Sequence, residues 1–403
     1  MSKTLLLLGG SRYLFPVIDA AHEMDVEVVT ADYLPDNIAH TVSDRYCNVS
    51  IVGKEAVLEC AREVGADGIM SFAADPGVVS AAYAAERLGL PFQGSFEAVS
   101  ILQDKQRFRS FLRENDFSCP EMRVFSSAEE ARAAADGLAY PVIAKPVDSA
   151  GSKGCSRVDS PEGLPAAVEE ALGFSRGGRC IVEGFLERAY PSSDADAFTV
   201  DGRFECVSFT SQLFDASCPN PYAPAAYAMP CAMPEEAQTE LRSELQRLAD
   251  LLGLRSGIYN VEARVATDGR PYIMEVSPRG GGNRLAEMLR FATGGVADLV
   301  AASVRAALGM PVGDVGMPSY DGFWHQEVLH SRHAGILRGV EYAPGFREAH
   351  VADEQLWIPL GSEVEAFASA NFAFGSVMLR FSSKEELAEF EAEKGRFIRV
   401  VVE

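Results

Sequence analysis

Residues 272–282 read Tyr-Ile-Met-Glu-Val-Ser-Pro-Arg-Gly-Gly-Gly, and residues 260–265 just upstream read Asn-Val-Glu-Ala-Arg-Val. Each stretch is a short run of β-type residues that presents one glutamate, Glu262 in the upstream run and Glu275 in the other. Asp268-Gly269, between them, is a strong signal for a hairpin turn. Adjacent antiparallel strands can hold two such carboxylates about 5 Å apart at Cβ. The stretch therefore predicts a hairpin with two facing acids.

Two facing carboxylates repel each other unless a positive charge lies between them. Oxygen ligands suit Mg²⁺, which takes one or two carboxylates and completes its shell with water and phosphate oxygens. Arg279 follows Glu275 by four residues and precedes three glycines, which let a ligand approach the backbone closely. The segment thus predicts a magnesium and phosphate site. A solvated hairpin with incidental acids is the alternative.

The bulk composition excludes several classes of protein. The chain has 403 residues, enough for two to four domains, and a composition of 47% apolar and 23% charged residues, typical of a globular protein. A net charge of −22 argues against a nucleic-acid surface. The four leucines near the N-terminus are too few for a signal peptide or a membrane span, and eight scattered cysteines without a Cys-x-x-Cys pair fit a reducing compartment. We expect a cytoplasmic protein with neither nucleic acid nor membrane as a partner.

The first hundred residues alternate strand and helix patterns. Apolar runs at 4–8, 26–30 and 67–72 are separated by helical spacing over about 12–24 and 54–65, and another helix is expected over about 75–88. This alternation predicts a parallel sheet with a ligand crevice at the carboxyl ends of its strands, where residues 9–12, Asp32 and 71–75 fall. A glycine turn followed by Asp32 is typical of dinucleotide sites, but the turn lacks the G-x-G-x-x-G spacing.

A second informative stretch covers residues 140–154, Tyr-Pro-Val-Ile-Ala-Lys-Pro-Val-Asp-Ser-Ala-Gly-Ser-Lys-Gly. A strand that ends at Lys145 is followed by a loop of small residues with two glycines and Lys153. The backbone N–H groups of such a loop can surround phosphate oxygens, and lysines contribute point charges. A mobile surface hairpin is the alternative interpretation. Beyond about residue 317, short strands and glycine turns predict a small β-rich domain.

The order of these motifs resembles the ATP-grasp superfamily, in the arrangement of carbamoyl-phosphate-synthetase-like and biotin-carboxylase-like members. The motifs are Asp104-Lys105, the stretch 140–154, Ile-Val-Glu-Gly-Phe-Leu at 181–186, and the two strands of the hairpin. The resemblance implies an α/β chain in three parts. These are an N-terminal parallel-sheet domain over 1–103, a central ATP-grasp α+β domain over 104–310 with a lid at about 120–185, and a β-rich accessory domain over 311–403.

The resemblance also assigns roles to individual residues. Glu262 and Glu275 would hold Mg²⁺, for which Mn²⁺ is a substitute, and Arg279 would hold the transferred phosphoryl group as the catalytic cation. Glu183 would accept from the adenine amino group. The other ATP-binding residues it implies are Lys105, Lys145, Ser149, Gly151, Ser152, Lys153, Gly154, Phe185, Leu186 and Met274. Asn283 and Arg284 are expected near the substrate, and Asn283 is also expected to cap the following helix.

Two positions depart from the family's pattern. Many members have asparagine two residues after the second metal-binding glutamate, where this chain has Ser277. This leaves open how the second metal site is completed. The ribose-binding acid is not obvious either, and Glu187 and Asp194 are candidates.

The implied reaction is ATP-dependent ligation, in which a small carboxylate or amino acid becomes an acyl-phosphate and an amine or other nucleophile displaces phosphate. A bicarbonate-activating enzyme, like a carboxylase or a carbamoyl-phosphate synthetase, is one alternative. A nucleotide-binding regulatory protein without turnover is another. The expected partners are small carboxylate and amine substrates, and assembly into a homodimer is left open.

Overall fold

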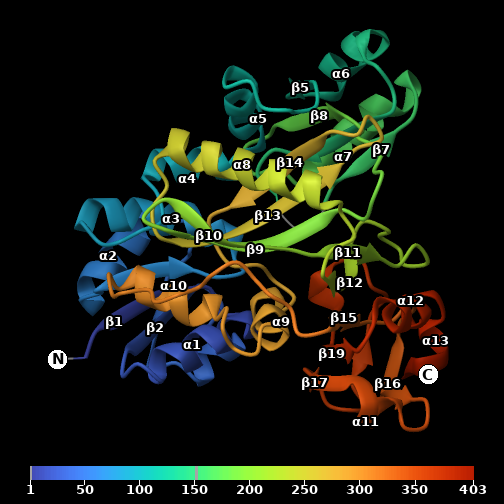
Figure 1. Cartoon of the computed structure of the whole chain (residues 1–403). Coiled ribbons are helices and arrows are strands. Elements are labelled where there is room, and N and C mark those ends of the chain that lie inside the picture. Colours follow the sequence, from blue (N-terminus) through green and yellow to red (C-terminus); the bar gives the residue numbers. More distant parts are fainter. Residues whose placement is uncertain (1, 150–152) are drawn as a thin grey trace.

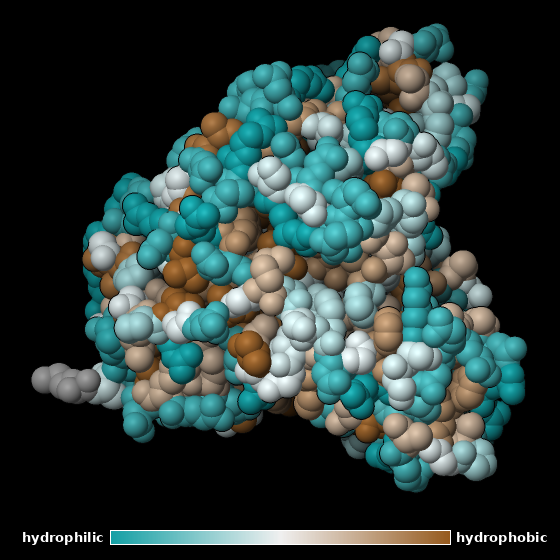
Figure 2. Space-filling view, in the orientation of Figure 1, coloured by the Kyte–Doolittle hydropathy of each residue, from teal (hydrophilic) through white to brown (hydrophobic). Residues whose placement is uncertain are grey.

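The computed structural model describes residues 2–149 and 153–403. A central antiparallel sheet lies in the middle, and an N-terminal parallel sheet, a projecting lid and a C-terminal β-rich lobe surround it (Figure 1). In the space-filling view the lid and the C-terminal lobe project separately, and an indentation lies between them (Figure 2). The predicted fold class is confirmed. Among the helices of the described residues, none has both the length and the apolar composition needed to cross a membrane.

The N-terminal sheet is parallel, with strand order β3-β2-β1-β4. The side chains of β1 are fully buried, because helices cover both faces of the sheet. Its elements are β1 (Thr4–Leu8), η1 (Arg12–Leu14), α1 (Phe15–His22), β2 (Glu27–Asp32), η2 (Ile38–Thr41), β3 (Arg45–Asn48), α2 (Lys54–Val64), β4 (Gly68–Ser71) and α3 (Asp75–Leu88).

Two features of this region were not predicted. The edge strand β3 has no apolar run, since it is polar and partly exposed, and it therefore gives no strand signal. Helix α10 (Leu299–Ala307), far along the chain, packs with α1 against the same sheet and shares its hydrophobic core. Asp32, considered above for a ribose, accepts a hydrogen bond from the Leu34 backbone N–H at 2.9 Å and does not line the main cleft.

The lid is an antiparallel sheet of order β5-β8-β6-β7 with two covering helices. Its hydrophobic core contains residues of 125–182 alone, so the lid packs as a unit around its own centre. Helices α4 (Phe96–Gln103) and α5 (Lys105–Glu114) precede it. The lid elements are β5 (Met122–Phe125), α6 (Ala128–Ala134), η3 (Ala135–Gly137), β6 (Val142–Pro146), β7 (Ser156–Val158), η4 (Pro161–Gly163), α7 (Leu164–Gly173) and β8 (Cys180–Gly184).

The central sheet has the order β10-β9-β13-β14, and its neighbouring strands are antiparallel. Helix α8 buries Leu241, Leu245 and Leu248 against this sheet and ends at Gly253 in the left-handed conformation. The elements are β9 (Ser193–Val200), β10 (Arg203–Phe209), α8 (Glu235–Leu252), β13 (Gly257–Val265), β14 (Pro271–Ser277) and α9 (Leu285–Ala292).

The C-terminal lobe contains a sheet of order β11-β12-β15-β19-β17 and a smaller one of order β18-β16-β20. The larger sheet joins β11 and β12, which lie in the middle of the chain, to three C-terminal strands. The domain boundaries given above stay predictions. The elements are β11 (Ser211–Phe214), β12 (Pro224–Met229), β15 (Phe323–Leu329), β16 (Gly335–Tyr342), α11 (Phe346–His350), β17 (Val351–Leu356), β18 (Glu363–Val364), η5 (Ala370–Phe372), β19 (Gly375–Phe381), α12 (Lys384–Ala392), α13 (Lys394–Phe397) and β20 (Ile398–Val402).

Candidate active site

The predicted hairpin is present, and its two glutamates face each other. Strands β13 and β14 pair antiparallel with Glu262 directly opposite Glu275, and Gly269 in the turn has a left-handed φ of 82°. Both glutamates line a cleft of about 710 Å³, a volume within the usual range for a small-molecule site.

Strand β9 adds a third acid to this pair. Asp194 on β9 lies opposite Glu262 on β13, which places three carboxylates in a row across three strands. Because side chains alternate along a strand, the residues two positions away share the same face. They form a second row of Asp196, Asn260 and Ser277. The sequence pattern offered no signal for this alignment, since strand register joins residues almost seventy positions apart.

A lysine lies beside the acidic pair. The Lys105 Nζ is 3.6 Å from the Glu275 Oε2 and donates to the Ser149 backbone oxygen at 2.8 Å. Burial alone would lower the pKa of Lys105, but the negative charges around it, led by Glu275, together outweigh burial and the pKa is raised. Lys105 thus joins the glycine-rich loop to the acidic pair, and its contact with the ATP phosphates stays a prediction.

The glycine-rich loop is described only at its two ends. Ser149 and Lys153 line the cleft, and Gly154 has a left-handed φ of 65°. Gly151 and Ser152, also predicted to bind phosphate, lie outside the described residues. The phosphate-binding role of the loop stays a prediction.

Glu183 is the most enclosed of the predicted residues, with 1% of its surface exposed. Its Oε1 accepts from the Arg109 Nε at 2.6 Å, and Lys145 forms an ion pair with the same carboxylate. Burial alone would raise the pKa of Glu183, but these two cations lower it to about 2. The carboxylate is therefore already engaged, and its predicted bond to the adenine amino group stays a prediction.

Arg109 was missed by the sequence reasoning. It lies on α5, is 2% exposed, and joins Glu183 on β8 to the Met274 backbone oxygen on β14, at 2.8 Å. The available signal was an arginine on the apolar face of a helix, between Phe108 and Leu112, where a charge needs a buried partner.

The expected adenine side of the cleft is lined by Phe185, Leu186 and Met274. The Arg157 guanidinium lies 4.5 Å from the centre of the Phe185 ring, and the Leu186 carbonyl accepts from Arg264 at 2.9 Å. These contacts fix the connector between the lid and the central sheet. The side chains of Phe185, Leu186 and Met274 themselves form an apolar wall of the kind that a base can stack on.

Arg279 forms a two-pronged ion pair with Asp75. Its Nε and one terminal nitrogen each lie 2.8 Å from a carboxylate oxygen. Asp75 begins α3 at the carboxyl end of the parallel sheet and lines the cleft, as the crevice prediction requires, although it was not predicted as a site residue. The Ser277 hydroxyl lies 3.0 Å from the Asp75 Oδ1 and 3.2 Å from the Glu275 Oε1. Ser277 thus connects the metal pair to the Arg279–Asp75 pair.

The two predicted substrate residues differ in position. Asn283 lines the cleft, donates to the Tyr227 hydroxyl at 2.9 Å and accepts from the Tyr13 hydroxyl at 3.2 Å. Arg284 does not line the cleft and instead forms ion pairs with Glu287 and Asp353. The prediction that Asn283 caps the following helix is wrong. Arg284 occupies the N-cap position instead. Asn283 and Arg284 both have positive φ, so the chain turns sharply before α9.

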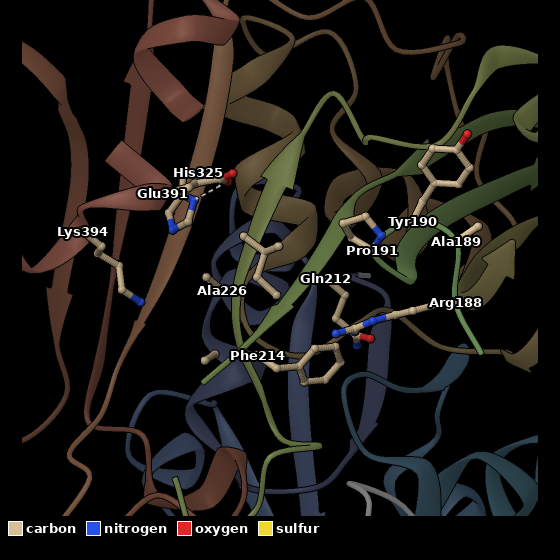
Figure 3. Close-up of a pocket in the computed structure, with 12 residues that line it drawn as sticks. Arg188, Ala189, Tyr190, Pro191, Gln212, Phe214, Ala226, His325, Glu391 and Lys394 are labelled. Atoms are coloured by element: carbon tan, nitrogen blue, oxygen red, sulfur yellow. Dashed lines mark hydrogen bonds and ion pairs between the residues drawn. The ribbon is translucent and has the colours of Figure 1, made fainter. Parts of the chain in front are cut away.

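A second cavity of about 500 Å³ adjoins the cleft, and Arg188, Gln212 and Phe214 line both. Figure 3 shows the Arg188 and Gln212 side chains close together beside the Phe214 ring, with His325 and Glu391 across the cavity. The cleft therefore continues toward the C-terminal lobe.

Two acids of the first row, Glu262 and Glu275, suit a divalent cation. Glu262 is open to the cleft but surrounded by protein, and burial, followed by the charges of Glu275 and Asp194, raises its pKa to about 8. Burial and the nearby Asp196 raise the pKa of Asp194 to about 7. A bound cation offsets the electrostatic repulsion between carboxylates that lie this close together. The residues present therefore fit Mg²⁺ between Glu262 and Glu275.

This electrostatic arrangement predicts a pH-dependent affinity for divalent cations. Below about pH 8, folded Glu262 retains a proton that the unfolded chain, with its ordinary pKa near 4.5, releases. The cation-free protein therefore loses stability as the pH rises through this window, and a bound cation must displace the proton. We expect Mn²⁺ affinity to rise by about tenfold per pH unit between pH 6 and 8, measured by electron paramagnetic resonance. Equal affinities at pH 6 and 8 would contradict this assignment.

Comparison with known proteins agrees with this geometry. The family profile described as an ATP-grasp domain matches residues 102–283. The chain contains an ATP-grasp domain. The resemblance drawn from the motifs is thus confirmed, and the matched residues run from the end of α4 through the lid to the glycines after Arg279.

Relatives by sequence match part of the chain. The carbamoyl phosphate synthase large chain of Thermotoga petrophila is 28% identical over 226 residues, which are 56% of this chain and 20% of that protein. The formate-dependent phosphoribosylglycinamide formyltransferase of Prochlorococcus marinus is 32% identical over 189 residues, 46% of this chain and 48% of that protein. The chain thus matches about a fifth of the length of the first relative and about half of the second.

Solved structures resemble the ATP-grasp domain together with its flanking parts. An L-amino acid ligase from Bacillus licheniformis has a TM-score of 0.80 at 19% identity, covering 100% of this chain and 99% of that one. A phosphoribosylglycinamide synthetase from Anaerococcus prevotii has a TM-score of 0.78 at 18% identity, covering both chains fully. These likenesses establish the fold of the whole chain.

Proposed function

We propose that the protein is an ATP- and Mg²⁺-dependent ligase that activates a small carboxylate or amino acid as an acyl-phosphate. In the first step, a carboxylate oxygen attacks the γ-phosphorus of ATP and the bond to ADP breaks. In the second, an amine nitrogen attacks the acyl carbon and phosphate leaves, which forms a C–N bond. Both steps need positioning and charge neutralisation more than covalent catalysis.

One observation supports this proposal most directly: the facing pair Glu262 and Glu275 shares a single cleft with Lys105 and the Arg279–Asp75 pair. Mg²⁺ held by the two glutamates would neutralise phosphate oxygens. Lys105 would contribute a second charge beside the glycine-rich loop, and Arg279 would hold the acyl-phosphate. The lid would exclude water from that intermediate.

The test is ADP release from Mg²⁺-ATP in the presence of separate pools of amino acids, other small carboxylates and bicarbonate. We expect stimulation by an amino-acid or carboxylate pool, and hydroxylamine should trap the intermediate as a hydroxamate. Stimulation by bicarbonate alone would favour carboxyphosphate chemistry. ATP binding without turnover in every pool would favour a regulatory protein.

Arg279→Lys tests the role of the guanidinium. Lysine retains a charge beside Asp75 but cannot form the two-pronged contact. We expect substrate-stimulated ADP release to fall by about 10- to 100-fold while ATP binding changes little, because charge-assisted hydrogen bonds of this kind contribute about 1.5–3 kcal/mol. Arg242→Lys, at a surface ion pair, is the control. Unchanged ADP release in Arg279→Lys would remove Arg279 from the mechanism.

A further inference from the structure

The central sheet contains two buried carboxylates, Asp194 in the first row and Asp196 in the second, that have no direct ion pair among the described residues. Burial raises the pKa of both, and the charge of Arg279 partly offsets this rise. Asp194 and Asp196 are 7% and 1% exposed, and neither forms an ion pair with any residue of 2–149 or 153–403. The Asp194 Oδ1 accepts from the Asn260 amide at 2.6 Å, and the Asp196 Oδ1 accepts from the Gly281 N–H at 2.7 Å. Acids this deeply buried are usually paired with a cation.

Each of the two carboxylates has one oxygen without a donor in the described part of the chain. The Asp196 Oδ2 is fully enclosed and has no hydrogen-bond partner. Asp194 lines the cleft, and no described group donates to its Oδ2. An oxygen in this position can accept from a ligand that enters the cleft.

Asp194 also lies on the side of the Glu262–Glu275 pair that is away from Lys105. In the acidic row, Glu275 is at one end beside Lys105 and the glycine-rich loop, and Asp194 is at the other end. Glu262 lies opposite Asp194 and Arg279 acts on Asp194 by charge, while the other cleft-lining groups on this side include the uncharged Ser193, Gln212 and Tyr227. The Ser193 hydroxyl is buried and likewise has no partner among the described residues. On this side the cleft continues past Gln212 into the second cavity (Figure 3).

We propose that Asp194, considered above for the ribose, instead binds the amino group of the incoming nucleophile, a primary amine that arrives as an ammonium ion, with Asp196 adding negative charge behind it. This inference rests on the proposed ligase function and names the acceptor that its second step uses. The ammonium loses two protons as the C–N bond forms and the bond from the acyl carbon to the phosphate oxygen breaks. One proton leaves with hydrogen phosphate and the other goes to solvent.

The test separates the two steps with a nucleophile that needs no ammonium site. Hydroxylamine is small and uncharged at neutral pH, so it attacks an acyl-phosphate directly. Wild type and Asp194→Asn are compared for hydroxamate formation with hydroxylamine and for amide formation with a pool of amino acids. We expect Asp194→Asn to keep its hydroxamate rate within about twofold and to lose about 10- to 100-fold in amide formation, chiefly through a higher KM for the amine.

Asp194→Ser is a second variant at the same position, and Asp136→Asn, at an exposed position, is the control. Thermal unfolding confirms that each variant is folded. Mn²⁺ affinity in the presence of ATP distinguishes an ammonium site from a third metal ligand. Equal losses of hydroxamate and amide, a loss of neither, or a tenfold weaker Mn²⁺ affinity in both Asp194 variants would overturn the proposal. Absence of hydroxamate in the wild type would instead overturn the ligase function itself, and this inference with it.

Discussion

Glu275→Gln is expected to reduce substrate-stimulated ADP release by at least about 100-fold. Glu275 faces Glu262 across the hairpin, lies 3.6 Å from the Lys105 Nζ, and accepts a hydrogen bond from the Ser277 hydroxyl. Glutamine has nearly the same shape but lacks the negative charge, so the divalent cation loses an anionic ligand and Lys105 loses its ion-pair partner. Phosphoryl transfer depends largely on such charge neutralisation.

The measurement couples ADP release to a Mn²⁺ titration by electron paramagnetic resonance. Glu275→Gln should lower both activity and Mn²⁺ affinity, whereas Glu235→Gln, at an exposed position on α8, should change neither. If Glu275→Gln turned over ATP at the wild-type rate, the metal site would have to lie elsewhere.

Arg109→Met is expected to lower the free energy of unfolding by about 3–5 kcal/mol, because it removes one partner of a buried ion pair. Arg109 and Glu183 are 2% and 1% exposed, and the same guanidinium donates to the Met274 carbonyl. The variant leaves Glu183 with Lys145 as its single cation and leaves a buried carbonyl without its donor. Since Arg109 joins α5, β8 and β14, the lid should also become less firmly held.

Urea unfolding followed by circular dichroism checks this expectation. Arg242→Met removes an exposed ion pair with Glu235 and should cost less than about 1 kcal/mol. Adding Glu183→Gln to Arg109→Met should recover part of the loss, because the unpaired buried charge is then absent. If Arg109→Met were no more destabilising than Arg242→Met, the buried pair would not hold the lid.

The acidic hairpin and the position of Lys105 could be predicted because each depends on residues that are close together in the sequence. Glu262 and Glu275 flank an Asp-Gly turn, and a hairpin turn of this kind fixes register within a few residues. In the same way, the position of Lys105 at the start of α5 follows from a helix signal, with Asp104 as the capping residue.

Contacts between distant segments could not be predicted in this way. Asp75 reaches Arg279 across 204 residues, and Arg109 reaches Glu183 across 74. The position of Asp194 in the acidic row depends on the register between β9 and β13, which no local signal encodes. A single sequence reports propensity and spacing, but not which strands become neighbours.

The sequence by itself therefore determined the parallel N-terminal sheet, the acidic hairpin, the ATP-grasp resemblance and a subset of the residues that line the cleft, among them both glutamates of the hairpin and Arg279. Only the tertiary structure decided that Arg284 is held by Glu287 and Asp353 away from the cleft, that Glu183 is buried between two cations, and that Asp194 completes a row of acids. The physical reason is that a residue's type fixes which charge it carries, whereas packing decides whether that charge meets a partner, solvent or a ligand.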